Sequence, residues 1–239
     1  TRMLLTIGTK GVCDGPDTAT PQKAYPSCGE PGYNTSQTLL NDPADIWVDP
    51  GPDPVTGQIG SVYIADGYGN YRVVVFDAQG KFLRQMGNGP GSGPGQFVVR
   101  GGGHPHCVRV SNDGFVYACD RGQNRIHVFD KMGNFLKTLP VDPPGFMKAN
   151  SRATNFEFSR DPAQTWMFIS DIGSMHLWVM KRATGEIVSG IGQPGRNAGD
   201  LAVPHNMALD SKGTIYEAET LGGGRRVQKQ GRRDRPILM

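Results

Sequence analysis

The fold of this chain is decided by the stretch SVYIADGYGNYRVVVFDAQGKFLRQMG, which runs from Ser61 to Gly87. A second stretch, GFVYACDRGQNRIHVFDKMGNFLKTL from Gly114 to Leu139, repeats the same order of features. In both, an apolar run ends in Asp, a loop containing Asn leads to Arg, and another apolar run ends in Phe-Asp before a turn with Gly. Weaker copies lie at 166–192 and 214–229. The chain is therefore internally repeated, with a period of about 50 residues.

Each repeat contains about four predicted strands. The acid that ends the first apolar run returns in register in every copy, and a further short apolar run lies upstream of each copy. Turns such as SNDG and AQG separate the strands. Four antiparallel strands per repeat are typical of a β-propeller blade, which buries its apolar faces against neighbouring blades. A two-sheet sandwich would not require the acid to return at this register. The recurring acids are Asp66, Asp120, Asp171 and Glu219.

Two of these acids have an arginine shortly after them, Arg72 after Asp66 and Arg125 after Asp120. We predict that each pair ties the end of a strand to the following loop. The rest of the composition agrees with an all-β chain, since 34 glycines and 18 prolines fall between β-branched runs. A net charge of +3 does not indicate a nucleic-acid partner, and no apolar stretch is long enough to cross a membrane.

The repeats divide the chain into four parts. Residues 1–8 match the last strand of a preceding blade, 9–40 form an inter-blade loop insertion, 41–230 form four blades, and 231–239 form a basic tail. Two arrangements remain open. The first strand closes a four-bladed ring by completing the fourth blade, or the chain is part of a propeller with further blades upstream.

The four cysteines predict where disulfides form. Cys13 and Cys28 bracket a loop rich in Pro, Gly and Ser, and a disulfide between them would pin it. Cys107 and Cys119 lie on predicted neighbouring strands. Because paired cysteines in a loop-rich chain favour an oxidising compartment, we expect an extracytoplasmic protein, periplasmic or secreted.

Several of these motifs resemble one known family. The pieces DPADIWVDP, ADGYGNYRVVVFD, GPGQF, HPHCVRV, CDRGQNRI and VPHNMALD look like the NHL-repeat β-propellers, and most of all like the peptidylamidoglycolate lyase domain of peptide-amidating enzymes and its bacterial relatives. The resemblance covers roughly residues 41–229. It implies a six-bladed parent, which favours blades upstream of this chain.

The same resemblance implies a set of site residues. The lyase is a zinc enzyme with three histidines in Pro-His pairs that open inner strands, and the matching histidines here are His106 and His205. The family's catalytic Tyr matches Tyr68, and its substrate-holding Arg matches Arg121. The residue after the last histidine is Asn206 where the family has Asp, and Gly69 replaces a family cysteine. Asn206 is also a candidate for binding substrate.

Strand direction supports this grouping without the family. Inner strands begin, and the next strands end, on the same side of a blade, because the two run antiparallel. His106, His205, Tyr68 and Arg121 should therefore surround one mouth of the propeller channel. Imidazole ligands suit zinc, and calcium is a second candidate in a structural role. At such a site a metal would lower the pKa of a substrate hydroxyl, Tyr68 could relay its proton, and Arg121 could hold a carboxylate.

The sequence supports two functions of different kinds. One is a metal-dependent lyase that cleaves an α-hydroxyglycine-type group into an amide and glyoxylate. The other is a non-catalytic propeller whose face binds a small molecule, a peptide, a glycan, another protein or a second copy. The two Pro-His pairs favour the lyase, while the substitution at Asn206 and the missing third histidine favour the binding propeller. RNA binding is least favoured, because the charge is weak and aromatics do not interleave with it.

Overall fold

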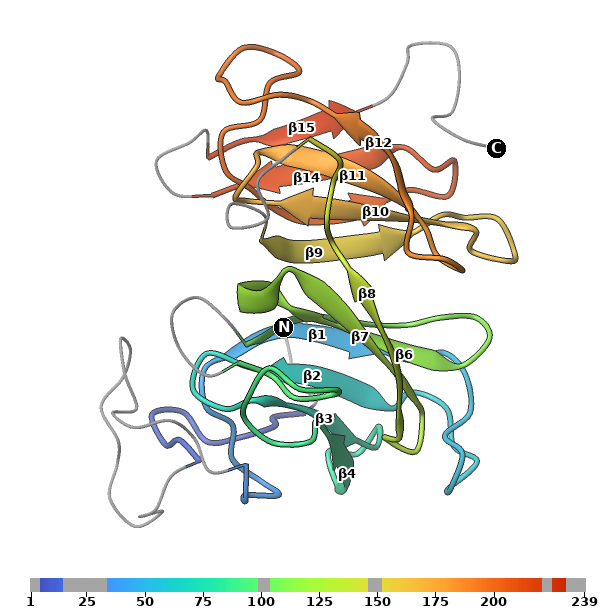
Figure 1. Cartoon of the computed structure of the whole chain (residues 1–239). Coiled ribbons are helices and arrows are strands. Elements are labelled where there is room, and N and C mark those ends of the chain that lie inside the picture. Colours follow the sequence, from blue (N-terminus) through green and yellow to red (C-terminus); the bar gives the residue numbers. More distant parts are fainter. Residues whose placement is uncertain (1–4, 15–33, 99–103, 146–151, 221–224, 231–239) are drawn as a thin grey trace. The chain divides into compact units, whose positions relative to one another are not determined.

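The computed structural model describes residues 5–14, 34–98, 104–145, 152–220 and 225–230. Within these residues the fold is all-β, with one turn of 3-10 helix, η1 (Arg121–Gln123). The strands form four antiparallel sheets with the neighbour order expected for propeller blades (Figure 1). In the described part of the chain no helix is long and apolar enough to cross a membrane.

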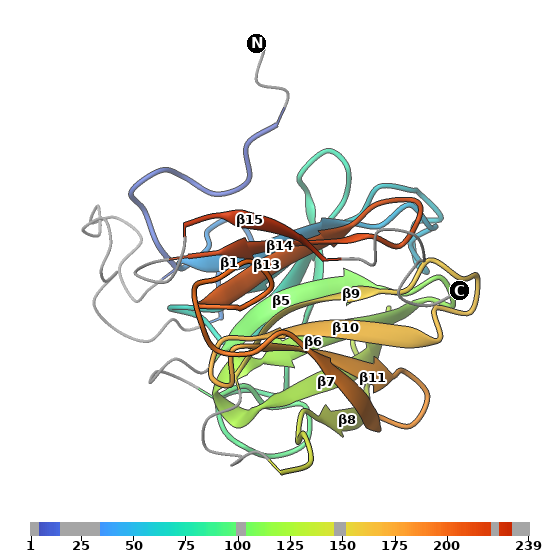
Figure 2. The same cartoon turned by 90° about the horizontal axis from the view of Figure 1, so that it is seen from above.

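The sheets follow the chain in order, as the repeats predict. The first contains β1 (Pro43–Val48), β2 (Val62–Asp66), β3 (Arg72–Phe76) and β4 (Phe82–Met86). The second contains β5 (Pro105–Val110), β6 (Phe115–Asp120), β7 (Arg125–Asp130) and β8 (Phe135–Pro140). The third contains β9 (Ala153–Phe158), β10 (Trp166–Asp171), β11 (His176–Lys181) and β12 (Ile187–Ile191). The fourth contains β13 (Pro204–Leu209), β14 (Ile215–Glu219) and β15 (Val227–Gln230), which lie side by side in Figure 2.

The chain divides into two compact units. One carries the first sheet and most of the second, and the other carries the third and fourth sheets. In the first unit, side chains of two sheets share one apolar core that includes Tyr63, Val75, Val108 and Phe129. In the second unit, an equivalent core joins β10 and β11 to β13 and β14. Because the middle strands are covered on both faces, β2 and β3 are buried along their whole length instead of alternating.

All four sheets share one irregularity, where the first strand meets the end of the second. The first residue of the inner strand pairs with the recurring acid at the end of the second strand. The register then shifts, which marks a β-bulge. Ala44, His106, Thr154 and His205 all fall within these bulges. The positions that the repeats align are therefore equivalent in the backbone. A bulge re-aims the side chain it carries, and bulges are common beside active sites.

The recurring acids hold the strand ends, as predicted for Asp66. Its carboxylate accepts hydrogen bonds from Asn70, from the backbone of Asn41 and from Arg72, whose Nε lies 2.9 Å away. Asp171 is held instead by Ser174 and by Trp178, while Glu219 pairs with Arg226. Asp120 lies 3.9 Å from His127. The acid is thus constant and its partner varies from blade to blade.

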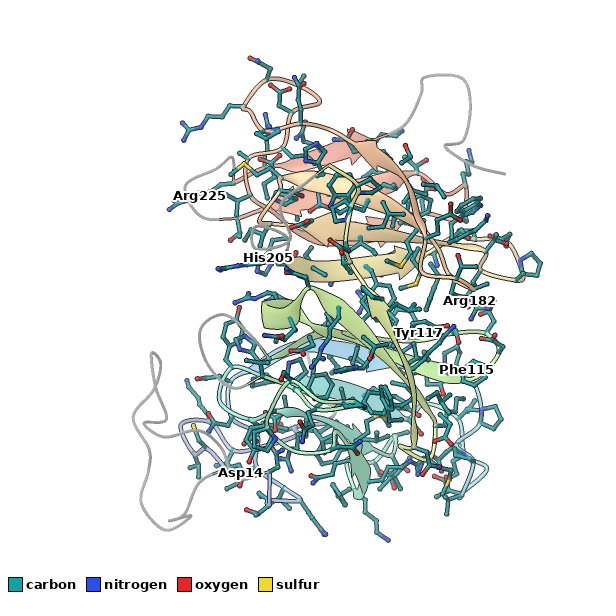
Figure 3. All side chains as sticks on the ribbon, viewed as in Figure 1. Asp14, Phe115, Tyr117, Arg182, His205 and Arg225 are labelled. Atoms are coloured by element: carbon teal, nitrogen blue, oxygen red, sulfur yellow. A yellow bond between two sulfur atoms is a disulfide. The ribbon has the colours of Figure 1, made fainter. Side chains whose placement is uncertain are left out.

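The segments before the first blade are partly described. Ile7 and Leu40 pack against Val62 and Ile64 of the first sheet, and residues 5–8 are not in a strand. Asp14, labelled in Figure 3, accepts hydrogen bonds from Thr35 and Ser36 and anchors the end of the insertion. Cys13 is disulfide-bonded. Its predicted partner Cys28, much of the insertion and the basic tail 231–239 lie outside the described residues.

Candidate functional site

Three of the residues predicted from the sequence meet in the first unit. The Oη of Tyr68 lies 2.9 Å from Nε2 of His106, and Nη1 of Arg121 donates a 3.1 Å hydrogen bond to the same Oη. The Arg121 guanidinium also lies over the Tyr68 ring, 5.3 Å from its centroid. His106 is almost fully buried, whereas Tyr68 is 40% exposed. One phenol therefore connects a buried imidazole to a solvent-accessible cation.

Local backbone structure explains why these side chains converge. Tyr68 stands in the loop between β2 and β3, and its N–H donates to the carbonyl of Asp42. The preceding residue is Gly67, where a Cβ would overlap the carbonyl oxygen of Pro105. The loop can therefore approach the start of β5 only because Gly67 has no side chain. Arg121 follows directly after β6, in η1.

The same loop accounts for a departure from the family pattern. A Cβ on Gly69 would overlap the side-chain amide of Asn41, so the Asn41 side chain occupies the space that a cysteine would need. Asn41 and Gly69 also share a backbone hydrogen bond of 3.0 Å. This loop is thus held by an asparagine at the point where the family pattern has a cysteine.

The structure adds a residue to which the sequence pattern assigned no role, His104. Its ring centroid lies 4.3 Å from that of Tyr68 and 6.1 Å from that of His106. The ring is 3% exposed, and neither of its nitrogen atoms has a hydrogen-bond partner among the described residues. Burial, reinforced by the charge of Arg121, lowers the pKa of His104 to about 3, so the imidazole is neutral. The only sequence signal was the His-Pro-His spacing, which places two imidazoles two residues apart.

A disulfide lies beside this group. Cys107 and Cys119 are bonded to each other, and both are fully buried. Cys107 follows His106 within the bulge of β5, and Cys119 stands two residues before Arg121. The bond therefore joins β5, which carries the imidazole of His106, to β6, the strand that directly precedes Arg121. The sequence placed both cysteines on neighbouring strands, as found.

The other two predicted residues belong to the second unit. His205 is half-buried in the bulge of β13, and Asn206 is exposed. The backbone N–H of His205 donates to the carboxyl group of Glu217, which also accepts a 2.7 Å hydrogen bond from Ser170. Burial, with the nearby charge of Glu219, raises the pKa of Glu217 to about 8. Figure 3 labels His205 among the side chains of this unit.

Two imidazoles of the first unit contact Tyr68, but the described residues do not form a complete metal site. His104 and His106 bring two imidazoles to Tyr68, and the nitrogens of His104 are buried without a partner. Neutral imidazole nitrogen is a preferred zinc ligand. Among the described residues, no group of three or more His, Cys, Asp or Glu is placed to hold an ion.

Comparison with known proteins identifies the class. Four antiparallel sheets, each built from a repeat of the same pattern, define the blades of a β-propeller. Residues 103–129 match the NHL repeat, and they include His104, His106, Cys107, Cys119 and Arg121. The chain is therefore a β-propeller protein that contains an NHL repeat.

Two relatives are amidating enzymes by name. The mouse (Mus musculus) "Peptidyl-glycine alpha-amidating monooxygenase" is 27% identical over 199 residues, which cover 78% of this chain and 18% of the relative. The nematode (Caenorhabditis elegans) "Probable peptidyl-alpha-hydroxyglycine alpha-amidating lyase pgal-1" is 30% identical over 95 residues, which cover 38% of this chain and 26% of the relative. This chain therefore spans only part of the length of these relatives.

A solved structure supports the fold alone. Hydrazine synthase from Kuenenia stuttgartiensis superposes with a TM-score of 0.55 at 18% identity, over 83% of this chain and 49% of that one. At an identity this low, the similarity supports a shared fold and says nothing about activity.

Proposed function

We propose that this chain is the site-bearing part of a zinc-dependent, lyase-like NHL propeller that acts on α-hydroxyglycine-type groups. The observation that supports it best is the contact of Tyr68 with both His106 and Arg121. These residues match the family's catalytic tyrosine, zinc histidine and substrate arginine. They come from three separate segments, so their convergence does not follow from neighbouring positions in the sequence.

Each residue has a defined task in this proposal. The reaction removes the proton of the substrate hydroxyl, forms a carbonyl at that carbon, breaks the carbon–nitrogen bond and returns a proton to the amide nitrogen. Arg121 binds the substrate carboxylate through its forked guanidinium. Tyr68 receives the hydroxyl proton at Oη and passes it on to the leaving nitrogen, while His106 holds that Oη in place. Zinc, held at His106 as the family pattern implies, would supply the Lewis acid that lowers the pKa of the substrate hydroxyl.

The test is turnover of an N-acyl α-hydroxyglycine, α-hydroxyhippurate, to benzamide and glyoxylate. We expect zinc-dependent turnover that falls about 100-fold or more in Tyr68→Phe, because proton transfer contributes about this much. Tyr216→Phe is the matched control. Among the described residues, the hydroxyl of Tyr216 forms a hydrogen bond with Asp210 only. Equal rates in Tyr68→Phe and wild type would contradict the assigned role.

A second candidate function is a non-catalytic propeller that binds a peptide, a glycan or another protein. Asn206 supports it, because an exposed neutral amide stands where the lyase family has an acid. The lack of a metal-binding group of three or more among the described residues points the same way. Zinc binding without turnover of any α-hydroxyglycine compound would favour this function.

The disulfide bears on the compartment. Cys107–Cys119 is buried and joins two strands of the site, so it forms part of the folded core. Disulfides of this kind persist where the surroundings are oxidising. We infer an extracytoplasmic location, which localisation of a tagged chain in its native host would test.

A further inference from the structure

His104 combines three features that are unfavourable for a side chain that only packs. It is 3% exposed, and within the part of the chain that the structure describes both of its ring nitrogens lack a hydrogen-bond partner. Its backbone has φ 99°, a left-handed conformation that is rare outside glycine. A phenylalanine ring would pack against Tyr68 without burying unpaired polar atoms. An orphaned polar group and a strained backbone at one residue are the features expected of a functional position.

A partner for the nitrogens of His104 would bind beside two other rings of the site, those of Tyr68 and His106. The Tyr68 ring lies 4.3 Å away, centroid to centroid, and the His106 ring lies 6.1 Å away at an interplanar angle of 32°. Two imidazoles bound to one tetrahedral zinc ion at about 2.0–2.1 Å place their centroids roughly 5 Å apart. The two rings are 6.1 Å apart, so they would approach each other by about 1 Å to share an ion.

Other elements hold His104 in this position. Its carbonyl accepts a 3.2 Å hydrogen bond from the N–H of Arg121, so its backbone is fixed to the residue that follows β6. Pro105, the next residue, pairs with Asp120 and restricts the chain between the two histidines. Gly67 allows the Tyr68 loop to close against this segment. Backbone contacts therefore fix the position of the ring, and its nitrogens take no part in them.

We propose that His104 is a metal ligand, so that the first unit supplies two imidazoles, His104 and His106, to one divalent ion of the zinc or cobalt class. This inference rests on the proposed function and changes its ligand set: two of the nitrogens come from one His-Pro-His segment. An ion bound there needs fewer ligands from elsewhere. The nitrogens of His104 then gain the partner that the described residues do not provide.

The test is titration of the metal-free chain with Co²⁺ followed by visible absorption, with Zn²⁺ in competition. We expect one bound ion, and at least a tenfold loss of affinity in both His104→Ala and His104→Phe. The phenylalanine variant keeps the ring packing and removes only the nitrogens. His176→Ala is the matched control, because His176 belongs to the second unit, where it stacks on Trp178 and hydrogen-bonds the carbonyl of Ser174. Circular dichroism confirms that each variant is folded.

The outcomes separate this inference from the proposed function. Wild-type affinity in His104→Phe would overturn the role of His104, and loss of affinity in His106→Ala alone would leave His106 as the ligand of the proposed function. No ion bound by the wild type would overturn both. A cobalt spectrum that depends on His104, in a chain that turns over no α-hydroxyglycine compound, would support His104 as a ligand. The same result would contradict the proposed lyase activity.

Discussion

The Pro-His pair occurs once in each compact unit, and the two copies have different surroundings. His106 and His205 lie in equivalent bulges of two blades, each next to the residue that pairs with the recurring acid of its blade. His106 is buried and meets the phenol of Tyr68, which in turn meets a guanidinium. His205 is half-buried, and its backbone meets the buried carboxyl group of Glu217. The backbone repeat fixes where a side chain stands, whereas the loops and neighbouring strands decide its chemistry.

The largest difference that we expect between the units is in their response to pH. The folded pKa of Glu217, about 8, is above its ordinary 4.5, so the folded state binds more protons than the unfolded state between these values. Stability of the second unit should therefore fall as pH rises, by up to about 1.4 kcal/mol per pH unit. In the metal-free first unit, the folded pKa of His104, about 3, is below its ordinary 6.5, and stability should fall as pH drops through this range.

Hydrogen exchange of peptides from each unit, followed from acid to alkaline pH, measures this contrast. Glu217→Gln should remove the loss of stability between about pH 4.5 and 8 in the second unit only, and His104→Phe should reduce the loss below about pH 6.5 in the first unit only. Parallel pH profiles in the two units would break the comparison.

The next largest effect should come from the disulfide beside the first bulge. Removing the 12-residue link between Cys107 and Cys119 with paired serine substitutions should cost about 3 kcal/mol of unfolding free energy. Denaturant unfolding with and without reductant checks this, since reduced wild type should match the variant. The corresponding pair in the second unit, Asn206 and Ala218, has no such link. A loss below about 1 kcal/mol would show that the strand pairing alone holds the site.

Ligand binding should distinguish the two units at a smaller scale. Arg121→Ala should weaken glyoxylate binding about tenfold to 100-fold, the usual effect of losing a hydrogen bond between charged groups. Asn206→Ala removes a neutral, exposed amide and should change the affinity less than threefold or so. Isothermal titration of both variants measures the difference. Equal losses would mean that the second unit contributes to carboxylate binding as much as the first.

The smallest effect should be the difference in stability between the two histidine variants. His106→Ala removes a buried ring that contacts Tyr68, and we expect a loss of about 1–2 kcal/mol. His205→Ala truncates a half-buried ring, and we expect a change within about 0.5 kcal/mol. Thermal unfolding at one pH compares them. A larger loss in His205→Ala would show that its side chain carries structural contacts equal to those of His106.

Much of the framework could be predicted from the sequence, because a repeat reports its own register. The recurring acids and the four aligned inner-strand positions lie at equivalent places, and Asp66 binds Arg72 as expected. The meeting of Tyr68, His106 and Arg121 followed from strand direction and from the family resemblance. His104 was not predicted, because it has no counterpart in other repeats. The partner of Asp171, Trp178, was missed because the arginine pattern fails in that blade.

The bulge also bears on how such a chain changes over evolutionary time. An extra residue in the inner strand is left outside the ladder of backbone hydrogen bonds, so its identity is freed from strand pairing. Alanine, threonine and two histidines fill the four copies of this position over the same local pairing. A single codon change could therefore add or remove an imidazole in one blade without rebuilding it. Because the residue in each bulge can change without altering the strand pairing, a binding residue can be gained or lost in one blade at a time.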